Sequence, residues 1–138
     1  MILLCLLTCL SANPGLTEFV VAPGSESSRL AYLFPHGGEI ILGGSEAAGD
    51  WTLEPVPAVA GQILRDCAAI EPRLTGARVL AHRVGLRPAR PTVRLEAEPA
   101  GPDGGPPVVH NYGHGGAGVS LSWGCAREAA ALAAERLG

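Results

Sequence analysis

Residues 108–126 read VVHNYGHGGAGVSLSWGCA, and they combine a short predicted strand, a glycine-rich loop and the start of a predicted helix. The loop, residues 113–118, has the spacing G-x-G-x-x-G, which is informative only between a strand and a helix. Glycines let a backbone approach a flat or anionic ligand closely, and a helix start offers free N–H groups with partial positive charge. The stretch therefore indicates either a site for a negative or planar group or a tight turn with no ligand.

A complete dinucleotide-binding domain is not predicted from this loop. A Rossmann unit needs a second parallel strand after the helix, with an acidic residue near the end of that strand. The sequence ends at Gly138, inside or directly after the predicted helix. We therefore expect a loop for a negative or planar group without a full dinucleotide domain around it.

The sequence around this stretch predicts antiparallel strands with short connections. A turn at 35–38 separates two apolar runs, which is a hairpin signal. Apolar residues spaced three and four apart predict a helix over 55–70, and an alanine-rich helix is predicted over 119–137. Strands are predicted over 17–22, 30–34, 39–42, 77–86, 92–98 and 108–112. The expected fold class is α+β, with a mainly antiparallel sheet and two main helices.

The composition fits a packed domain and argues against several classes of function. Apolar residues make up 47% of the 138 residues, which is enough for a hydrophobic core. The net charge is -3 and no basic patch stands out, so nucleic acid is not an expected partner. The four cysteines form no C-x-x-C pair and no Cys/His cluster with zinc spacing, so no metal site is expected.

The N-terminal run Met1–Leu10 is almost wholly apolar. It is too short to span a bilayer as a helix, which takes about 20 residues, so no membrane association is expected. It also lacks the basic start of a signal peptide. Three interpretations stay open: a weak export signal, a buried strand, or a start site inside a longer ancestral gene. We expect a cytoplasmic location, with export as the alternative.

Residues 85–91 read GLRPARP, in which a proline follows each of the two arginines. Prolines fix φ and remove backbone donors, so the segment is stiff and its arginines have little entropy to lose. A fixed guanidinium suits a bidentate grip on a carboxylate. A surface strand whose arginines are solvated has the same pattern, and the segment alone does not separate the two interpretations.

Three stretches together resemble the D-amino-acid oxidase family, which includes D-aspartate oxidases. The resemblance covers the chain from about Asn13 to its C-terminus, and residues 1–12 do not share it. The third stretch is close to the signature of that family and is the most specific. The stretches are YLFP at 32–35 with LGG at 42–44, GLRPARP at 85–91 with RLE at 94–96, and VHNYGHGGAG at 109–118 with WGCA at 123–126.

This resemblance implies a two-lobed flavoprotein of which the chain is the C-terminal part. The family binds most of its FAD with an N-terminal Rossmann-like lobe, which has no counterpart in the sequence. Residues 1–12 are then an atypical apolar segment, and 13–107 form part of the substrate-binding domain. Residues 108–138 form the strand, glycine loop and helix that complete the FAD domain.

The resemblance also assigns site residues by position. Arg87 matches the arginine that binds the substrate carboxylate, Tyr32 a tyrosine that hydrogen-bonds the same group, and Gly116 the residue whose carbonyl accepts the substrate amine. The expected flavin contacts are Gly115, Gly116, Gly118, Val119 and Ser120. Two positions depart from the family: Ser28 stands where a second pocket tyrosine is expected, and Ala117 where a larger residue is common.

The implied reaction is the oxidative deamination of a D-amino acid, with molecular oxygen as the second substrate. Hydride passes from the substrate Cα to the flavin, the imino acid hydrolyses to a 2-oxo acid and ammonia, and oxygen becomes hydrogen peroxide. The chain alone is expected to be inactive and to need the FAD lobe as its partner. Two alternatives are a truncated non-catalytic fragment and a related glycine or amine oxidase.

Overall fold

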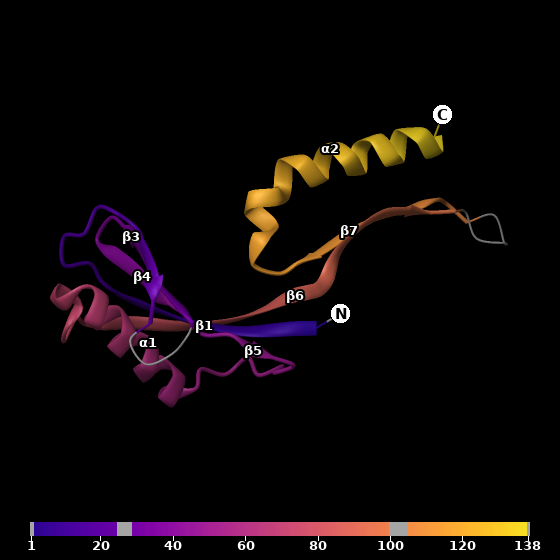
Figure 1. The fold of residues 1–138 in the computed structure, drawn as a ribbon. Coiled ribbons are helices and arrows are strands. Elements are labelled where there is room, and N and C mark those ends of the chain that lie inside the picture. The colour runs from indigo at the N-terminus through magenta and orange to yellow at the C-terminus, as the bar shows by residue number, and fades with distance from the viewer. Residues whose placement is uncertain (1, 25–28, 100–104, 138) are drawn as a thin grey trace. The chain divides into compact units, whose positions relative to one another are not determined.

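The computed structural model describes residues 2–24, 29–99 and 105–137. These residues form two compact units, one made of Leu4–Leu86 and the other of Arg87–Gly138 together with Met1–Leu3 (Figure 1). The boundary between the units lies inside one long strand. Each unit is described by itself below.

The unit Leu4–Leu86 is an antiparallel sheet with one helix packed on it. Its sheet runs in the order β2-β3-β4-β1, with β6 beside β1 and β5 also paired with β1. A hairpin of β3 and β4 pairs Tyr32 with Gly43 and His36 with Glu39, as the turn at 35–38 predicts. The elements are β1 (Ile2–Ala12), β2 (Val20–Pro23), β3 (Leu30–His36), β4 (Glu39–Gly43), β5 (Ala47–Ala48), α1 (Pro57–Ile70), the short 3-10 helix η1 (Pro72–Leu74) and the first part of β6 (Val79–Glu98).

The core of this unit lies between the sheet and α1. Alternate residues of β3 and β4 are buried on the α1 side, because successive side chains of a strand point to opposite faces. Helix α1 contacts both strands and buries one stripe of side chains, which is the pattern that predicted it. The core residues are Leu7, Cys9, Ala31, Leu33, Ile40, Leu42, Ala60, Ile63, Cys67 and Leu74.

The apolar N-terminal run forms β1, as the strand interpretation expects. Leu7 and Cys9 are fully buried, and Ser11 is buried beside them. Antiparallel pairing with β4 matches Cys9 to Leu42 and Ala12 to Glu39. The hydrophobicity of this run is therefore explained by burial against α1 inside the sheet.

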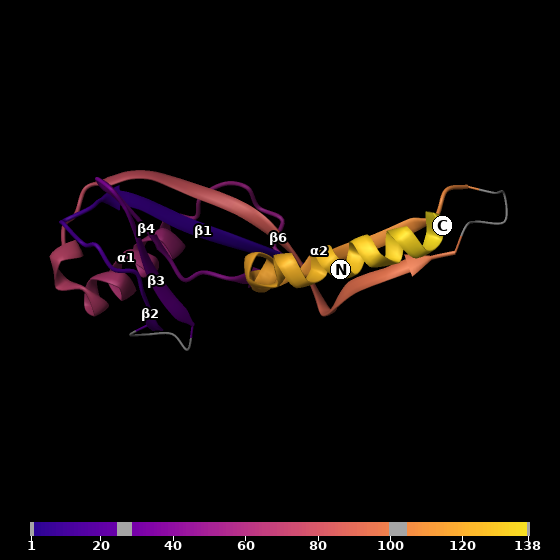
Figure 2. The same ribbon diagram turned by 90° about the horizontal axis from the view of Figure 1, so that it is seen from above.

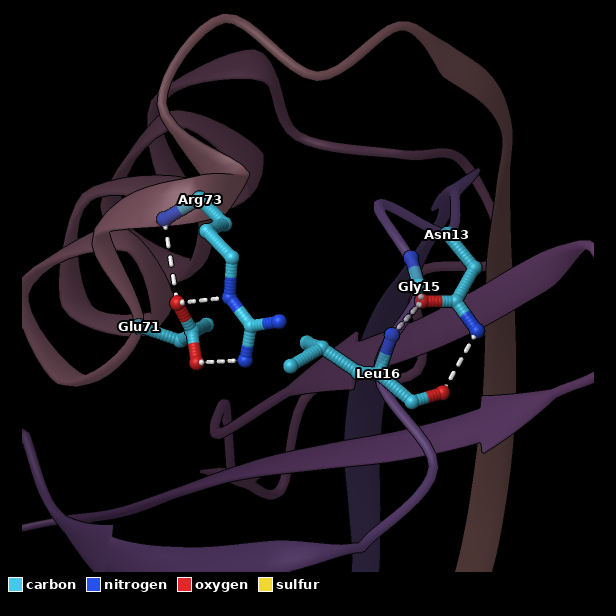
Figure 3. A network of polar contacts seen from close by, with 5 residues as sticks. All are labelled: Asn13, Gly15, Leu16, Glu71 and Arg73. Atoms are coloured by element: carbon cyan, nitrogen blue, oxygen red, sulfur yellow. Dashed lines mark hydrogen bonds and ion pairs between the residues drawn. The ribbon is translucent and has the colours of Figure 1, made fainter.

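Two polar clusters fix the connections of this unit (Figure 3). After β1, the Asn13 side chain accepts hydrogen bonds from the N–H groups of Gly15 and Leu16 and donates to the Leu16 carbonyl at 2.9 Å. After α1, Arg73 donates two side-chain hydrogen bonds to Glu71, at 2.9 and 2.8 Å. This pairing lowers the pKa of Glu71 to about 2, so its carboxylate stays charged over the whole neutral range.

The second unit is a hairpin followed by a helix. The end of β6 pairs antiparallel with β7 (Val108–His114), from Glu98 opposite Val108 to Arg94 opposite Tyr112. A 3-10 turn, η2 (Gly115–Ala117), joins β7 to α2 (Gly118–Leu137), and α2 runs along β7 (Figure 2). The strand, loop and helix predicted at 108–137 are therefore confirmed.

One element differs from the prediction. We expected two strands separated by residues 87–91, whereas β6 is a single strand through the whole arginine-proline segment. The φ of proline is close to that of extended backbone, and its missing N–H is tolerated where a ladder is irregular. The pairing with β7 shifts register between Ala89 and Arg94, so the prolines bend the ladder without ending the strand.

The predicted fold class is confirmed. The described residues form a mainly antiparallel sheet with two main helices. The compact units of the structure divide at Leu86. This division does not test the predicted domain boundary after residue 107, which stays a prediction. Residues 25–28 and 100–104, which include Ser28, lie outside the described residues.

Candidate functional site

Arg87 and Gly116 lie against each other in the second unit, although 29 positions separate them in the sequence (116 minus 87). A Cβ placed on Gly116 would lie 3.3 Å from Nη1 of Arg87, so the guanidinium faces the backbone of the glycine turn. Arg87 is half-buried, and among the described residues no carboxylate or other acceptor pairs with it. A held guanidinium without an anionic partner is suited to a carboxylate ligand.

Two other arginines of this strand, Arg90 and Arg94, pack against Tyr112. Arg90 presses its aliphatic stem against Gly113, where a Cβ would lie 2.6 Å from Cδ, and holds its guanidinium 5.5 Å from the Tyr112 ring centroid. Arg94 donates to the Tyr112 hydroxyl at 3.1 Å and forms ion pairs with Glu96 and with Glu98. Of these three arginines, Arg87 is the one with neither an aromatic contact nor an ion pair among the described residues.

The ion pairs around Arg94 form a small network on the β6–β7 hairpin. His110 Nε2 lies 3.1 Å from Glu98 Oε1, and Arg94 bonds to the same carboxylate. Contacts with His110 and Arg94 lower the pKa of Glu98, while the hydroxyl of Tyr112 and the two carboxylates raise the pKa of Arg94. The network holds Tyr112 and the end of the strand in place. We therefore assign a structural role to this network.

The glycine turn has the backbone that only glycine adopts readily. Gly113 has φ +86° and Gly115 has φ +54°, both in the left-handed region. Beside the turn lies a hollow of about 330 Å³, lined by Pro88, Asn111, Tyr112, Gly113, His114, Gly115 and Gly118. A hollow bounded by backbone on one side and by a proline on the other fits a flat ligand group.

The residues predicted to contact the flavin lie at the rim of this turn and at the start of α2. Gly116, Gly118, Val119 and Ser120 are exposed, and Gly115 is half-buried. The first turn of α2 carries no acidic residue, so the partial positive charge of the helix start is not neutralised there. The chemistry of these groups fits the electron-rich edge of a flavin ring, and Ala117, half-buried beside them, leaves space where the family often has a larger side chain.

Tyr32 belongs to the first unit, on the face of the sheet opposite α1. Its ring lies over Gly43, since a Cβ on that glycine would come within 2.1 Å of the Tyr32 ring, and it stacks near Phe34 with a centroid separation of 5.0 Å. The ring is therefore held in one position by the strand opposite. Arg87 and Gly116 are brought together by one unit, whereas Tyr32 is placed by the other.

The sequence did not predict the packing role of two glycines that lie against these side chains, although both belong to stretches singled out above. Gly43 makes room for Tyr32, and Gly113 makes room for Arg90. The hairpin turn at 35–38 contains the signal for Gly43, because pairing residue 36 with residue 39 puts residue 32 opposite residue 43. No comparable signal exists for Gly113, whose partner lies across a register shift.

Helix α2 carries large apolar side chains that the described residues do not cover. Trp123 is 85% exposed, and Val119 on the same helix is 90% exposed. Helix α2 buries little of its own surface in the described residues. The indole of Trp123 would be buried only if another layer of structure packed over α2, and the described residues supply no such layer.

Comparison with known proteins gives this geometry a context. The sequence profile of FAD dependent oxidoreductases matches residues 10–132. The chain belongs to this family. The family resemblance inferred from the three stretches is thereby confirmed.

Several relatives of this oxidoreductase chain are known by name. It is 59% identical over 126 residues to D-amino-acid oxidase of Rubrobacter xylanophilus, which covers 91% of the chain and 38% of the relative. It is 54% identical to D-amino-acid oxidase of Streptomyces coelicolor, over 88% of the chain and 37% of the relative. It is 47% identical to human D-aspartate oxidase, over 80% of the chain and 33% of the relative. The chain thus spans little more than a third of the length of these relatives.

A solved structure shows the same fold. Glycine oxidase from Geobacillus kaustophilus superposes with a TM-score of 0.80 at 18% identity, covering 98% of this oxidoreductase chain and 36% of the other. At this identity the likeness concerns the fold alone. In the described part of the chain, no helix has the length and hydropathy to cross a membrane, and no cluster of three metal-ligating side chains occurs.

Proposed function

We propose that this chain provides the substrate-carboxylate grip and part of the flavin-contacting turn of an FAD-dependent D-amino-acid oxidase. The observation that carries the proposal is the unpaired Arg87 guanidinium beside Gly116, at a turn that borders a hollow of about 330 Å³. The names of the relatives at 47–59% identity support D-amino acids as the substrate class.

The proposed roles follow from the chemistry of each residue. Arg87 binds the substrate carboxylate through two parallel N–H donors, which fixes one end of the amino acid. The Gly116 carbonyl accepts a hydrogen bond from the substrate amine, and Tyr32 adds a donor to the carboxylate, as the family resemblance implies. The substrate would be held at two points, its carboxylate and its amine, with the flavin ring as a third surface. Only one configuration at Cα would then direct its hydrogen to the ring, so this arrangement would select D over L.

The residues that would hold the flavin are Gly115, Gly116, Gly118, Val119 and Ser120. When bound, FAD supplies the two-electron chemistry and passes the electrons to molecular oxygen. The start of α2 stabilises negative charge that gathers on the ring edge during reduction, because its N–H groups point toward the turn. No general base is needed when the substrate reacts as its neutral amine.

The test is a fusion of this chain to the portion of the Rubrobacter xylanophilus enzyme that the chain does not match. We expect oxygen uptake with D-amino acids, with peroxide and 2-oxo acid formed in equal amounts, and no reaction with the L isomers. Faster oxidation of glycine or simple amines would favour the glycine or amine oxidase alternative. A fusion that is folded and holds flavin yet oxidises none of these compounds would favour a non-catalytic fragment.

A further inference from the structure

A cysteine–histidine pair lies beside the glycine turn and takes no part in the proposed reaction. Nε2 of His114, the last residue of β7, is 3.4 Å from Sγ of Cys125 on α2. Both side chains are half-buried, so small molecules reach them while bulk water does not surround them. We propose that Cys125 is a peroxide-sensitive thiol that His114 activates.

The pair has the geometry that thiol activation requires. An imidazole at hydrogen-bond distance accepts the thiol proton, and the resulting cation stabilises the thiolate, which is the nucleophilic form of cysteine. Reactive cysteines are partly exposed and lie next to a histidine or another basic group, whereas structural cysteines are buried and inert. Cys125 meets the first description.

Two of the other cysteines, Cys9 and Cys67, meet the second description, and Cys5 is half-buried like Cys125 but has no histidine beside it in the described residues. Cys9 and Cys67 are fully buried, and burial raises their pKa values to about 11 and about 12. Cys5 donates to the Thr52 carbonyl, and burial together with Asp50 raises its pKa. No histidine contacts any of these three in the described residues, so they supply internal references for the reactivity of Cys125.

The proposed reaction is balanced with one peroxide molecule. The Cys125 thiolate attacks a peroxide oxygen, so that an S–O bond forms and the O–O bond breaks. Sulfur is oxidised to sulfenic acid by two electrons, and the peroxide is reduced. The departing hydroxide takes the proton that His114 holds and leaves as water.

This modification lies where it would affect the turn. His114 directly precedes η2, and its contact with Cys125 links the end of β7 to α2. Added oxygen on sulfur changes the size and polarity of that contact, so oxidation shifts the first residue of the turn. Hydrogen peroxide is the co-product of the proposed function, but the chemistry needs only a peroxide and is tested without turnover.

The experiment uses the intact 138-residue chain with added hydrogen peroxide and a dimedone-type probe for sulfenic acid, followed by peptide mass spectrometry. We expect Cys125 to be labelled first among the four cysteines. Cys125 has an imidazole at hydrogen-bond distance that can accept its proton, whereas burial and Asp50 raise the pKa of Cys5. The advantage of Cys125 over Cys5 should therefore be roughly three- to tenfold in rate.

Two variants make the test specific. His114→Gln should remove most of this advantage, whereas the matched variant His110→Gln, on the same strand but away from Cys125, should leave it intact. In a denaturant-unfolded sample the variants and the parent should react alike. Equal labelling of Cys125 and Cys5 in the folded parent, or an unchanged rate in folded His114→Gln, would overturn the proposal, and the first of these comparisons needs no variant at all.

Discussion

At the scale of single residues, the partners of each arginine decide its role. Arg87, Arg90 and Arg94 lie on one strand, but Arg94 is ion-paired, Arg90 lies against an aromatic ring, and Arg87 is unpaired. The pattern of the segment alone left Arg87 and Arg90 equivalent, since both precede a proline, and only the family resemblance assigned the substrate carboxylate to Arg87. In the structure, contacts that cross from β6 to the glycine turn and to β7 distinguish them, and such contacts depend on tertiary structure.

Replacing Arg87 should therefore weaken substrate binding in the fusion protein described above. Loss of a charged, bidentate partner in a partly buried site costs about 2–5 kcal/mol, so Arg87→Ala should raise KM for D-amino acids by about 30-fold or more. Arg87→Lys should recover only part of this, because the planar fork is lost. Steady-state kinetics at saturating oxygen measure both values.

Arg90→Ala is the matched control for this prediction. It removes an arginine of the same strand that packs on Gly113 and Tyr112. We expect lower thermal stability with a smaller change in KM. A large rise in KM for Arg90→Ala together with a small one for Arg87→Ala would show that the wrong arginine has been assigned.

At the scale of secondary-structure elements, short-range patterns predicted the strands and helices well. The hairpin of β3 and β4, helix α1 and the strand–turn–helix of the second unit all appear within a few residues of their predicted limits. The two-residue strand β5 was missed because so short an element leaves no periodic pattern. The continuity of β6 was missed because proline signals a break locally, while the neighbouring strand decides whether the break occurs.

Two glycines of the turn should respond differently to substitution. Gly113→Ala places a Cβ 2.6 Å from Arg90 at φ +86°, so it should destabilise the chain by about 1–3 kcal/mol. Gly116→Ala meets only the flexible end of Arg87 at 3.3 Å, so it should leave stability nearly unchanged. Urea unfolding of the isolated chain measures both, and the idea fails if the two variants are equally stable.

In the fusion protein, a larger change at Gly116 should act on turnover. Gly116→Val directs two methyl groups at the space that we assign to substrate and ring, and the distant contacts of the cofactor remain. Turnover should then fall more than FAD affinity does. Loss of FAD with an unchanged rate per bound flavin would mean that the turn serves another part of the cofactor.

The attachment of α1 to the sheet should depend on pH. Cys67 is fully buried, with its thiol 3.7 Å from the Tyr32 carbonyl, and burial raises its pKa to about 12. Because the folded thiol keeps a proton that the unfolded thiol loses from about pH 9, its stabilising contribution is complete below pH 9 and is lost as the pH rises toward 12. All ten cationic side chains are arginines, so no lysine titrates in this range.

We therefore expect the urea midpoint to be lower at about pH 10.5 than at about pH 8. Cys67→Ala should reduce that difference, although it also lowers stability at both pH values by leaving a small cavity. Ile63→Val, which leaves a small cavity on the same helix without removing a thiol, is the control and should keep the full pH dependence. An identical pH dependence in Cys67→Ala and the parent chain would contradict the assignment.

At the scale of the whole molecule, the chain behaves as part of a larger architecture. Its family relatives are roughly two and a half times as long, and the boundary between its two compact units lies inside one strand. The family resemblance predicted this from the order of three stretches. Sequence did not predict where the units divide, because the division depends on how densely distant segments pack.

The isolated chain should hold FAD weakly or not at all. The residues assigned to the flavin make up one rim, and the resemblance implies that most contacts of the cofactor come from parts of the relatives that this chain does not match. After incubation with excess FAD and desalting, we expect a colourless protein with no flavin absorbance. A yellow protein with one flavin per chain would refute this expectation.

The exposed side chain of Trp123 has an optical consequence. The chain has two tryptophans, and Trp51 is 67% exposed while Trp123 is 85% exposed. Both indoles therefore emit in a water-like environment while the protein is folded, so denaturation should shift the emission maximum very little. The same spectrum becomes a sensitive reporter in the fusion protein, where any surface that covers α2 moves the emission of Trp123 toward the blue.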